Sequence, residues 1–169
     1  MKKKVFAYFI SVATVFVLLS ACSSAQKEAT KTDNVEDLHV YHAENGDLRE
    51  WTESSKHLPQ FLKDKPEQMQ LIYGAVAGHQ ELLEHIPCYC GCAESGDHMN
   101  NYDCFVFENK QGGEVVWDDH GTRCGVCLET AAESIVQHKE GKPIKEIRQY
   151  IDEKYKKGYA KPTPTPFPS

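Results

Sequence analysis

Three cysteines stand at alternate positions in the short stretch HIPCYCGCAESGDH, which covers residues 85–98. A disulfide between Cys88 and Cys90, or between Cys90 and Cys92, would close a strained ring of very few atoms, because the bond needs suitably spaced Cα atoms and converging Cβ vectors. These thiols therefore either pair with cysteines elsewhere in the chain or bind a metal ion.

Three further cysteines follow, at Cys104, Cys124 and Cys127. Cys124 and Cys127 form a C-x-x-C motif at the predicted start of a helix, where the helix dipole favours the thiolate form. Leu128 occupies the position where a c-type haem motif requires histidine, and a polar, turn-like segment precedes the motif in place of the buried strand typical of thioredoxin-like dithiols.

The six cysteines between positions 88 and 127 leave three kinds of chemistry open. A disulfide framework is one, although six cysteines allow 15 connectivities and the sequence selects none of them. A metal site is the second, because soft thiolates bind Cu(I) or Zn²⁺ and zinc sites use similarly short spacings. A redox-active dithiol at the C-x-x-C motif is the third. We favour a copper or zinc site, for which the candidate ligands are Cys88, Cys90, Cys92, Cys104, Cys124, Cys127 and, as a further candidate, His98.

The other polar residues give weaker signals. His120 lies beside two aspartates and is predicted to be a turn residue, while Asp47, Glu50 and Glu53 are predicted to be solvated at a helix start. A nucleophilic enzyme needs a thiol or hydroxyl matched to a base and an orienting group. Nothing in the sequence points to such a set, and we expect the protein not to be an enzyme.

The N-terminus carries an export signal. Three lysines precede an uncharged apolar run that is shorter than the ~20 residues of a spanning helix. The run ends in Leu19-Ser20-Ala21-Cys22, which resembles the lipobox of bacterial lipoproteins. We therefore expect residues 1–21 to be removed and Cys22 to be diacylated, so that two lipid chains hold the protein on the outer face of the cell membrane.

The expected mature chain is acidic and contains one domain. Its 148 residues hold 16 basic and 25 acidic side chains, a net charge of −9, which argues against a nucleic-acid partner. Residues 22–47 are predicted to be a flexible tether and residues 158–169, rich in Pro and Thr, a disordered extended tail. The cysteine-rich domain is expected at residues 48–157.

The predicted fold is mostly α with a small β-hairpin. Apolar periodicity and prolines at helix starts predict helices within residues 59–86 and 124–155. Residues 104–107 and 114–117 read as two short strands joined by a turn. Pro87 disfavours helix at the preceding residue, which places the cysteines on a loop. We expect this loop to lie near the helix start at Cys124, within one compact helical domain.

The sequence resembles a family of bacterial exported lipoproteins named for its PCYCGC motif. The resemblance rests on the motif itself at residues 87–92, followed in order by His98, the Cys104-Phe105-Val106 strand, the segment from Trp117 to Cys127, and the run EIRQYID at residues 146–152. It spans roughly residues 58–155. The resemblance implies a folded domain shared by the family and a location in the cell envelope, but it implies no activity. Two functions therefore stay open: delivery of a metal ion to an envelope metalloprotein, and a binding module stabilised by disulfides.

Overall fold

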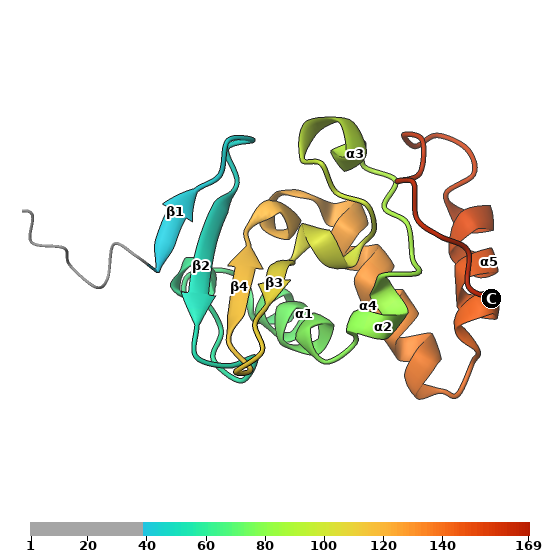
Figure 1. Cartoon of the computed structure of the whole chain (residues 1–169). Helices are drawn as coiled ribbons and strands as arrows, with labels where there is room; N and C mark the ends of the chain where they lie inside the picture. Colours follow the sequence, from blue (N-terminus) through green and yellow to red (C-terminus); the bar gives the residue numbers. More distant parts are fainter. Residues whose placement is uncertain (1–38) are drawn as a thin grey trace, which may run out of the picture. The chain divides into compact units, whose positions relative to one another are not determined.

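The structure is a computed structural model that describes residues 39–169 (Figure 1). The predicted signal peptide, Cys22 and most of the predicted tether lie outside the described residues. The strands are β1 (Val40–His42), β2 (Leu48–Thr52), β3 (Val106–Asn109) and β4 (Val115–Asp118). The α-helices are α1 (Glu67–Ala77), α2 (Gln80–Leu83), α3 (Cys92–Ser95), α4 (Gly125–Lys139) and α5 (Ile144–Lys154), and the 3-10 helices are η2 (Gln60–Leu62), η3 (Tyr102–Cys104) and η4 (His120–Arg123).

The strands form one antiparallel sheet in the order β1-β2-β4-β3. The prediction of a mostly helical fold with a small hairpin is therefore wrong, because the fold is mixed α/β. The predicted hairpin exists as β3 and β4, with an irregularity between Val106 and Glu108. It is one half of a sheet whose other half comes from residues 40–52, ahead of the cysteines (Figure 1).

Strand β2 escaped the sequence prediction because its charged residues have distant partners. The Arg49 Nε donates to Asp118 Oδ2 at 3.0 Å, across the β2–β4 pair. The Glu50 carboxylate accepts the backbone N–H of Gln60 at 2.5 Å and that of Phe61 at 3.2 Å, at the start of η2. A buried carboxylate is tolerated where it is hydrogen-bonded in this way. The expectation that Glu50 lies solvated at a helix start is wrong.

The helices α1, α2, α4 and α5 lie in the two segments in which periodicity predicts them, whereas α3, η3 and η4 lie between those segments and were not predicted. Helix α4 packs against α1, α2 and α5 (Figure 1). Pro66 and Pro143 immediately precede α1 and α5, where a missing N–H costs no helical hydrogen bond. Within residues 39–169, no helix is long and apolar enough to cross a membrane.

An aromatic core joins the sheet to the helices. Tyr73 of α1 packs edge-on against Phe105 with ring centroids 4.9 Å apart, and Trp117 of β4 lies next to both in the buried core. Both polar groups of these large side chains are satisfied. The Tyr73 hydroxyl donates to the Asp118 carbonyl at 3.0 Å, and the Trp117 indole N–H donates to Thr52 Oγ1 at 2.8 Å. Burial therefore leaves neither group without a partner.

The C-terminal segment differs from the prediction of a disordered tail at residues 158–169. It is extended, but Thr163 and Thr165 are buried, and Arg148 of α5 donates to the carbonyls of Thr165 and Pro166. The ordered structure of this segment could not be predicted from its sequence, because an extended Pro/Thr segment has no apolar periodicity. Hydrogen bonds to other parts of the chain hold it in place. The predicted tether also ends earlier than residue 47, because β1 pairs with β2.

We predict that Gly121→Ala destabilises the fold. A Cβ at Gly121 would lie 2.7 Å from Phe105 Cε1 and 2.9 Å from the Tyr73 hydroxyl, so the core must shift, and overpacking of this kind costs about 1–3 kcal/mol. Gly125→Ala is the matched control, since a Cβ there meets no atom within 4 Å. Urea unfolding of the reduced, metal-free protein measures both. Equal midpoints for the two variants would contradict the packing described.

Candidate metal centre

The motif loop, residues 87–92, begins four residues after the end of α2. The expectation that its cysteines lie on a loop is correct for Cys88 and Cys90 but wrong for Cys92, which is the first residue of α3. Gly91 has a φ of +87°, a conformation that favours glycine, and it lets the chain turn so that Cys92 starts α3. The sulfurs of Cys88, Cys90 and Cys92 all lie within 4.8 Å of one another. The loop therefore presents three thiols to one small volume.

The other three cysteines reach the same volume from two further segments. Cys104 ends η3 and is fully buried. Cys124 is the N-cap residue of α4, and Cys127 lies in its first turn, also fully buried. The predicted approach of the motif loop to the start of this helix is confirmed, because Cys90 Sγ and Cys127 Sγ are 3.5 Å apart.

Cys127 lies at the centre of the cluster. Its sulfur is 3.2 Å from that of Cys88 and 3.5 Å from those of Cys90 and Cys104. The chain of contacts continues from Cys104 to Cys92 at 3.7 Å, and Cys124 lies within 4.8 Å of Cys90 and Cys127. We call these six residues the thiol cluster.

The sulfur separations fit thiols around an ion better than they fit bonded pairs. All six cysteines are free, and the shortest separation, 3.2 Å, far exceeds the ~2.05 Å of a disulfide bond. Four thiolates held tetrahedrally at about 2.3 Å from Zn²⁺ would lie roughly 3.8 Å from one another. The cluster therefore needs to expand by only a few tenths of an ångström to surround an ion, and it can hold a metal.

Hydrogen bonds between the thiols divide the cluster into easily ionised and protonated members. Hydrogen bonds from Cys104 and then Cys127 lower the pKa of Cys88 to about 4, and one from Cys104 lowers that of Cys92 to about 2. The pKa of Cys127 is raised well above its usual range, first by Cys104 and Cys124. The hydrogen bonds therefore favour ionisation of Cys88 and Cys92 and oppose ionisation of Cys127, and a nearby cation would favour the thiolate form throughout the cluster.

His98 stands beside the thiol cluster, as its sequence position suggested. It is 3% exposed, and one ring nitrogen lies within 4.8 Å of the sulfurs of both Cys92 and Cys104. Neither ring nitrogen has a hydrogen-bond partner among the described residues. The side chain is placed to act as a ligand, and a carboxylate oxygen of Asp47, 3.8 Å from Nε2, approaches it without forming a hydrogen bond.

Two residues near His98 were missed by the sequence analysis. Asp47, predicted to be solvated, is buried, and His120, predicted to be an ordinary turn residue, places its Nδ1 3.2 Å from Asp47 Oδ1. A hydrogen bond to Cys90, followed by the charge of Asp47, raises the pKa of His120 to about 9. The contact between Asp47 and His120 joins positions 73 residues apart, so no local sequence signal could have revealed it.

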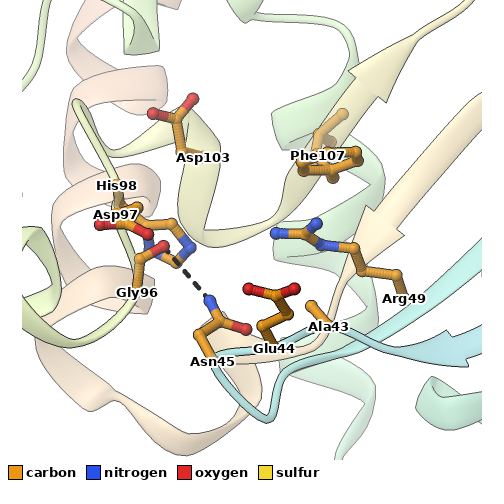
Figure 2. A pocket seen from close by; sticks show the side chains of 10 residues that line it. Ala43, Glu44, Asn45, Arg49, Gly96, Asp97, His98, Asp103 and Phe107 are labelled. Carbon is orange, nitrogen blue, oxygen red and sulfur yellow. Dashed lines mark hydrogen bonds between the residues drawn. The ribbon is translucent and has the colours of Figure 1, made fainter.

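An open cavity of about 480 Å³ lies next to His98. Figure 2 shows the His98 ring on one side of this cavity and the Arg49 guanidinium beneath the Phe107 ring on the other. Asn45 donates to the Gly96 carbonyl at 3.3 Å and so ties the β1–β2 loop to the segment that carries His98 (Figure 2). His98 therefore borders the cavity and also lies within 4.8 Å of the buried sulfurs of Cys92 and Cys104.

A family model described as "protein of unknown function with PCYCGC motif" matches residues 10–168. The chain belongs to the PCYCGC family. The family's defining motif is the loop that supplies three of the six clustered sulfurs. No curated protein and no solved structure matches the chain.

The C-terminal tail holds the PCYCGC loop by its backbone. The Cys88 N–H donates to Thr163 Oγ1 at 2.9 Å, and the Thr163 N–H donates to the Cys88 carbonyl at 2.9 Å. The Ala160 N–H donates to the Tyr89 carbonyl at 3.1 Å. The Tyr89 ring stacks on Tyr155, just after α5, with centroids 5.3 Å apart. The loop is therefore fixed from the side of α5 as well as by its cysteines.

We predict that Thr163→Val destabilises the protein and Thr163→Ser does not. Valine keeps the shape but leaves the buried Cys88 N–H without its acceptor, a loss of about 1–3 kcal/mol, whereas serine retains the hydroxyl. Lys161→Ala, at an exposed position of the same tail, is the control. Urea unfolding compares the four proteins. If the valine and serine variants unfold at the same midpoint, the tail does not hold the loop.

Proposed function

We propose that this protein is a membrane-anchored extracytoplasmic lipoprotein that binds a soft metal ion through its thiol cluster, for handling or delivery of that ion in the cell envelope. The observation that carries the proposal is the convergence of all six cysteines on one buried volume around Cys127. Ionised thiols are costly to bury unless a cation compensates their charge. A bound ion would supply that positive charge and would explain why the six cysteines lie together.

The position of the cluster argues against a disulfide staple. A disulfide stabilises a fold mainly by restricting the unfolded chain, and this effect depends on which loops the bonds close. Three bonds drawn from one contact cluster would tie the same three segments together repeatedly, at residues 88–92, 104 and 124–127. Distant parts of the fold, such as β1, β2 and α5, would gain no cross-link. Three disulfides formed within this cluster would therefore stabilise the fold less than three disulfides that join separate parts of it.

The cluster supports Cu(I) better than Zn²⁺. Soft thiolates select both ions, but zinc in structural sites takes four ligands in a closed tetrahedron. The sulfurs here form overlapping sets of three, such as Cys88, Cys104 and Cys127, or Cys90, Cys124 and Cys127. Cu(I) accepts two or three thiolates and shares them between neighbouring ions. We therefore propose copper as the cargo, with zinc as the alternative ion.

A dithiol redox role has less support. The attacking thiol of such proteins is accessible and has a lowered pKa. Cys124, the half-buried member of the C-x-x-C pair, has a raised pKa: its hydrogen bond with Cys127 lowers the value, but Cys90 and burial outweigh that effect. Cys127 is buried beneath it. The pair is better suited to ligate than to attack a disulfide.

The lipid anchor would set where the ion is handled. Two acyl chains on Cys22 are sufficient for stable attachment, and a tether would place the domain at the outer face of the membrane. The acidic net charge of −9 expected for the mature chain argues against nucleic acid as a partner. An envelope metalloprotein that receives the ion is the partner we propose.

We predict that the full chain binds Cu(I) and that Cys90→Ser weakens binding by at least about tenfold, since a lost ligand should cost no less than an altered supporting contact. Cys90 is the preferred position because it touches Cys88 and Cys127 yet is only half-buried, so that serine can be accommodated. Met99→Leu, which removes an exposed thioether near the motif, is the control. Competition with a chromophoric Cu(I) chelator under argon gives the affinities. Equal affinity in the cysteine and methionine variants would overturn the assignment.

We also predict that Cys22→Ala abolishes membrane attachment. The variant should appear in the soluble fraction or retain its signal segment, because the sulfur that would carry the lipid is absent. Ser23→Ala is the control and should behave as the wild type. Fractionation and intact mass measure the outcome. A Cys22→Ala protein found with membranes at the normal mature mass would disprove lipidation at this residue.

A further inference from the structure

The thiol cluster contains more ligands than one ion uses. A tetrahedral ion takes four, and six thiolates together with His98 offer seven. The candidate ligands form two overlapping groups. Cys88, Cys90 and Cys124 lie near Cys127, whereas Cys92 and His98 lie near Cys104. Cys104 also contacts Cys127, and Cys92 also lies within 4.8 Å of Cys88 and Cys90. The geometry thus contains a sulfur-only position and a mixed sulfur–nitrogen position.

The burial of His98 is a second observation, independent of the sulfur positions, that indicates metal binding at the mixed sulfur–nitrogen position. Its imidazole is 97% buried, with neither nitrogen hydrogen-bonded among the described residues. Burying an unpaired polar ring normally costs free energy, and native folds avoid it unless another partner is expected. Because the ring lies within 4.8 Å of the sulfurs of Cys92 and Cys104, a metal ion held by those sulfurs would satisfy one nitrogen.

Asp47 is placed to orient the ring. Its Oδ2 lies 3.8 Å from His98 Nε2, and the carboxylate is itself held by Asn45, His120 and Arg123. Metal-binding histidines commonly direct their second nitrogen at a carboxylate, which fixes the ring and increases its basicity. The His120 ring packs against His98 with centroids 4.5 Å apart and limits rotation from another side.

The cavity in Figure 2 gives this position a route to solvent. His98 lines it, and the sulfurs of Cys92 and Cys104, residues that are at most 1% exposed, lie within 4.8 Å of a His98 ring nitrogen. Three carboxylates, those of Glu44, Asp97 and Asp103, also line the cavity, so its wall attracts cations. No cysteine lines the cavity, and the sulfur-only position contains the two half-buried cysteines, Cys90 and Cys124.

We propose that Cys92, Cys104 and His98 form a second Cu(I) position, adjacent to the sulfur-only position and exchanging its ion through the cavity. This inference rests on the proposed function and extends it: the protein holds at least two Cu(I) ions that share Cys104, and the ion at His98 is the one next to the cavity. The cargo is accordingly a small copper–thiolate cluster rather than a single ion.

A pair of substitutions of matched size tests the second position. His98→Met places a thioether, a soft ligand for Cu(I), where the imidazole stood, and His98→Leu fills similar volume with no ligand. The full chain is loaded with Cu(I) under argon, and native mass spectrometry counts the ions per chain. We expect at least two ions in the wild type, the same number in His98→Met, and one fewer in His98→Leu. His138→Ala, an exposed histidine on α4, is the control and should match the wild type.

The outcomes separate the two proposals. No bound Cu(I) in the wild type would overturn the proposed function itself. One ion in both the wild type and His98→Leu would leave the proposed function standing and overturn the second position. Equal loading of two ions in His98→Met and His98→Leu would show that His98 is no ligand. X-ray absorption gives an independent measure, since the wild type should show a nitrogen neighbour of copper beside sulfur, and His98→Leu should show sulfur alone.

Discussion

The packing of six thiols around Cys127 is the constraint on which the rest of this structure depends. Sulfurs 3.2–3.7 Å apart can coexist in a protein interior as hydrogen-bonded thiols and thiolates, but their negative charge limits how many can ionise. A cation removes this limit. Under the proposed function, an ion bound by the cluster would add its binding free energy to the stability of the folded state.

The surrounding fold holds the six thiols in position and places buried carboxylates near them. The start of α4 fixes Cys124 and Cys127, the tail and α5 hold the motif loop, and the sheet carries the buried carboxylates. Asp47, at the edge of β2, joins the sheet to the cluster through His120 and approaches His98. The mixed α/β architecture thus has a functional consequence, because the strand that the sequence analysis missed brings the carboxylate that orients the histidines.

Sequence reasoning found the parts of the site that depend on local spacing. Alternate cysteines, the C-x-x-C motif at a helix start and the candidate ligand His98 are visible in short segments, and the approach of Cys90 to Cys127 followed from placing both cysteine groups at helix ends. It failed where long-range partners decide the structure. Glu50 in β2 reads as a surface residue until η2 is known to supply its donors, and Thr163 reads as disordered until Cys88 is known to bind it. Residue types reveal chemistry, but only the fold reveals which charges are paired.

The most direct test of this account is the oxidation state of the six cysteines in the protein purified from an oxidising envelope without reductant. Intact mass under denaturing conditions separates the two states, because each disulfide makes the chain about two hydrogens lighter. The account predicts the mass of a chain with six free thiols, together with copper in the native protein. A chain about six hydrogens lighter, with three disulfides and no metal, would contradict it.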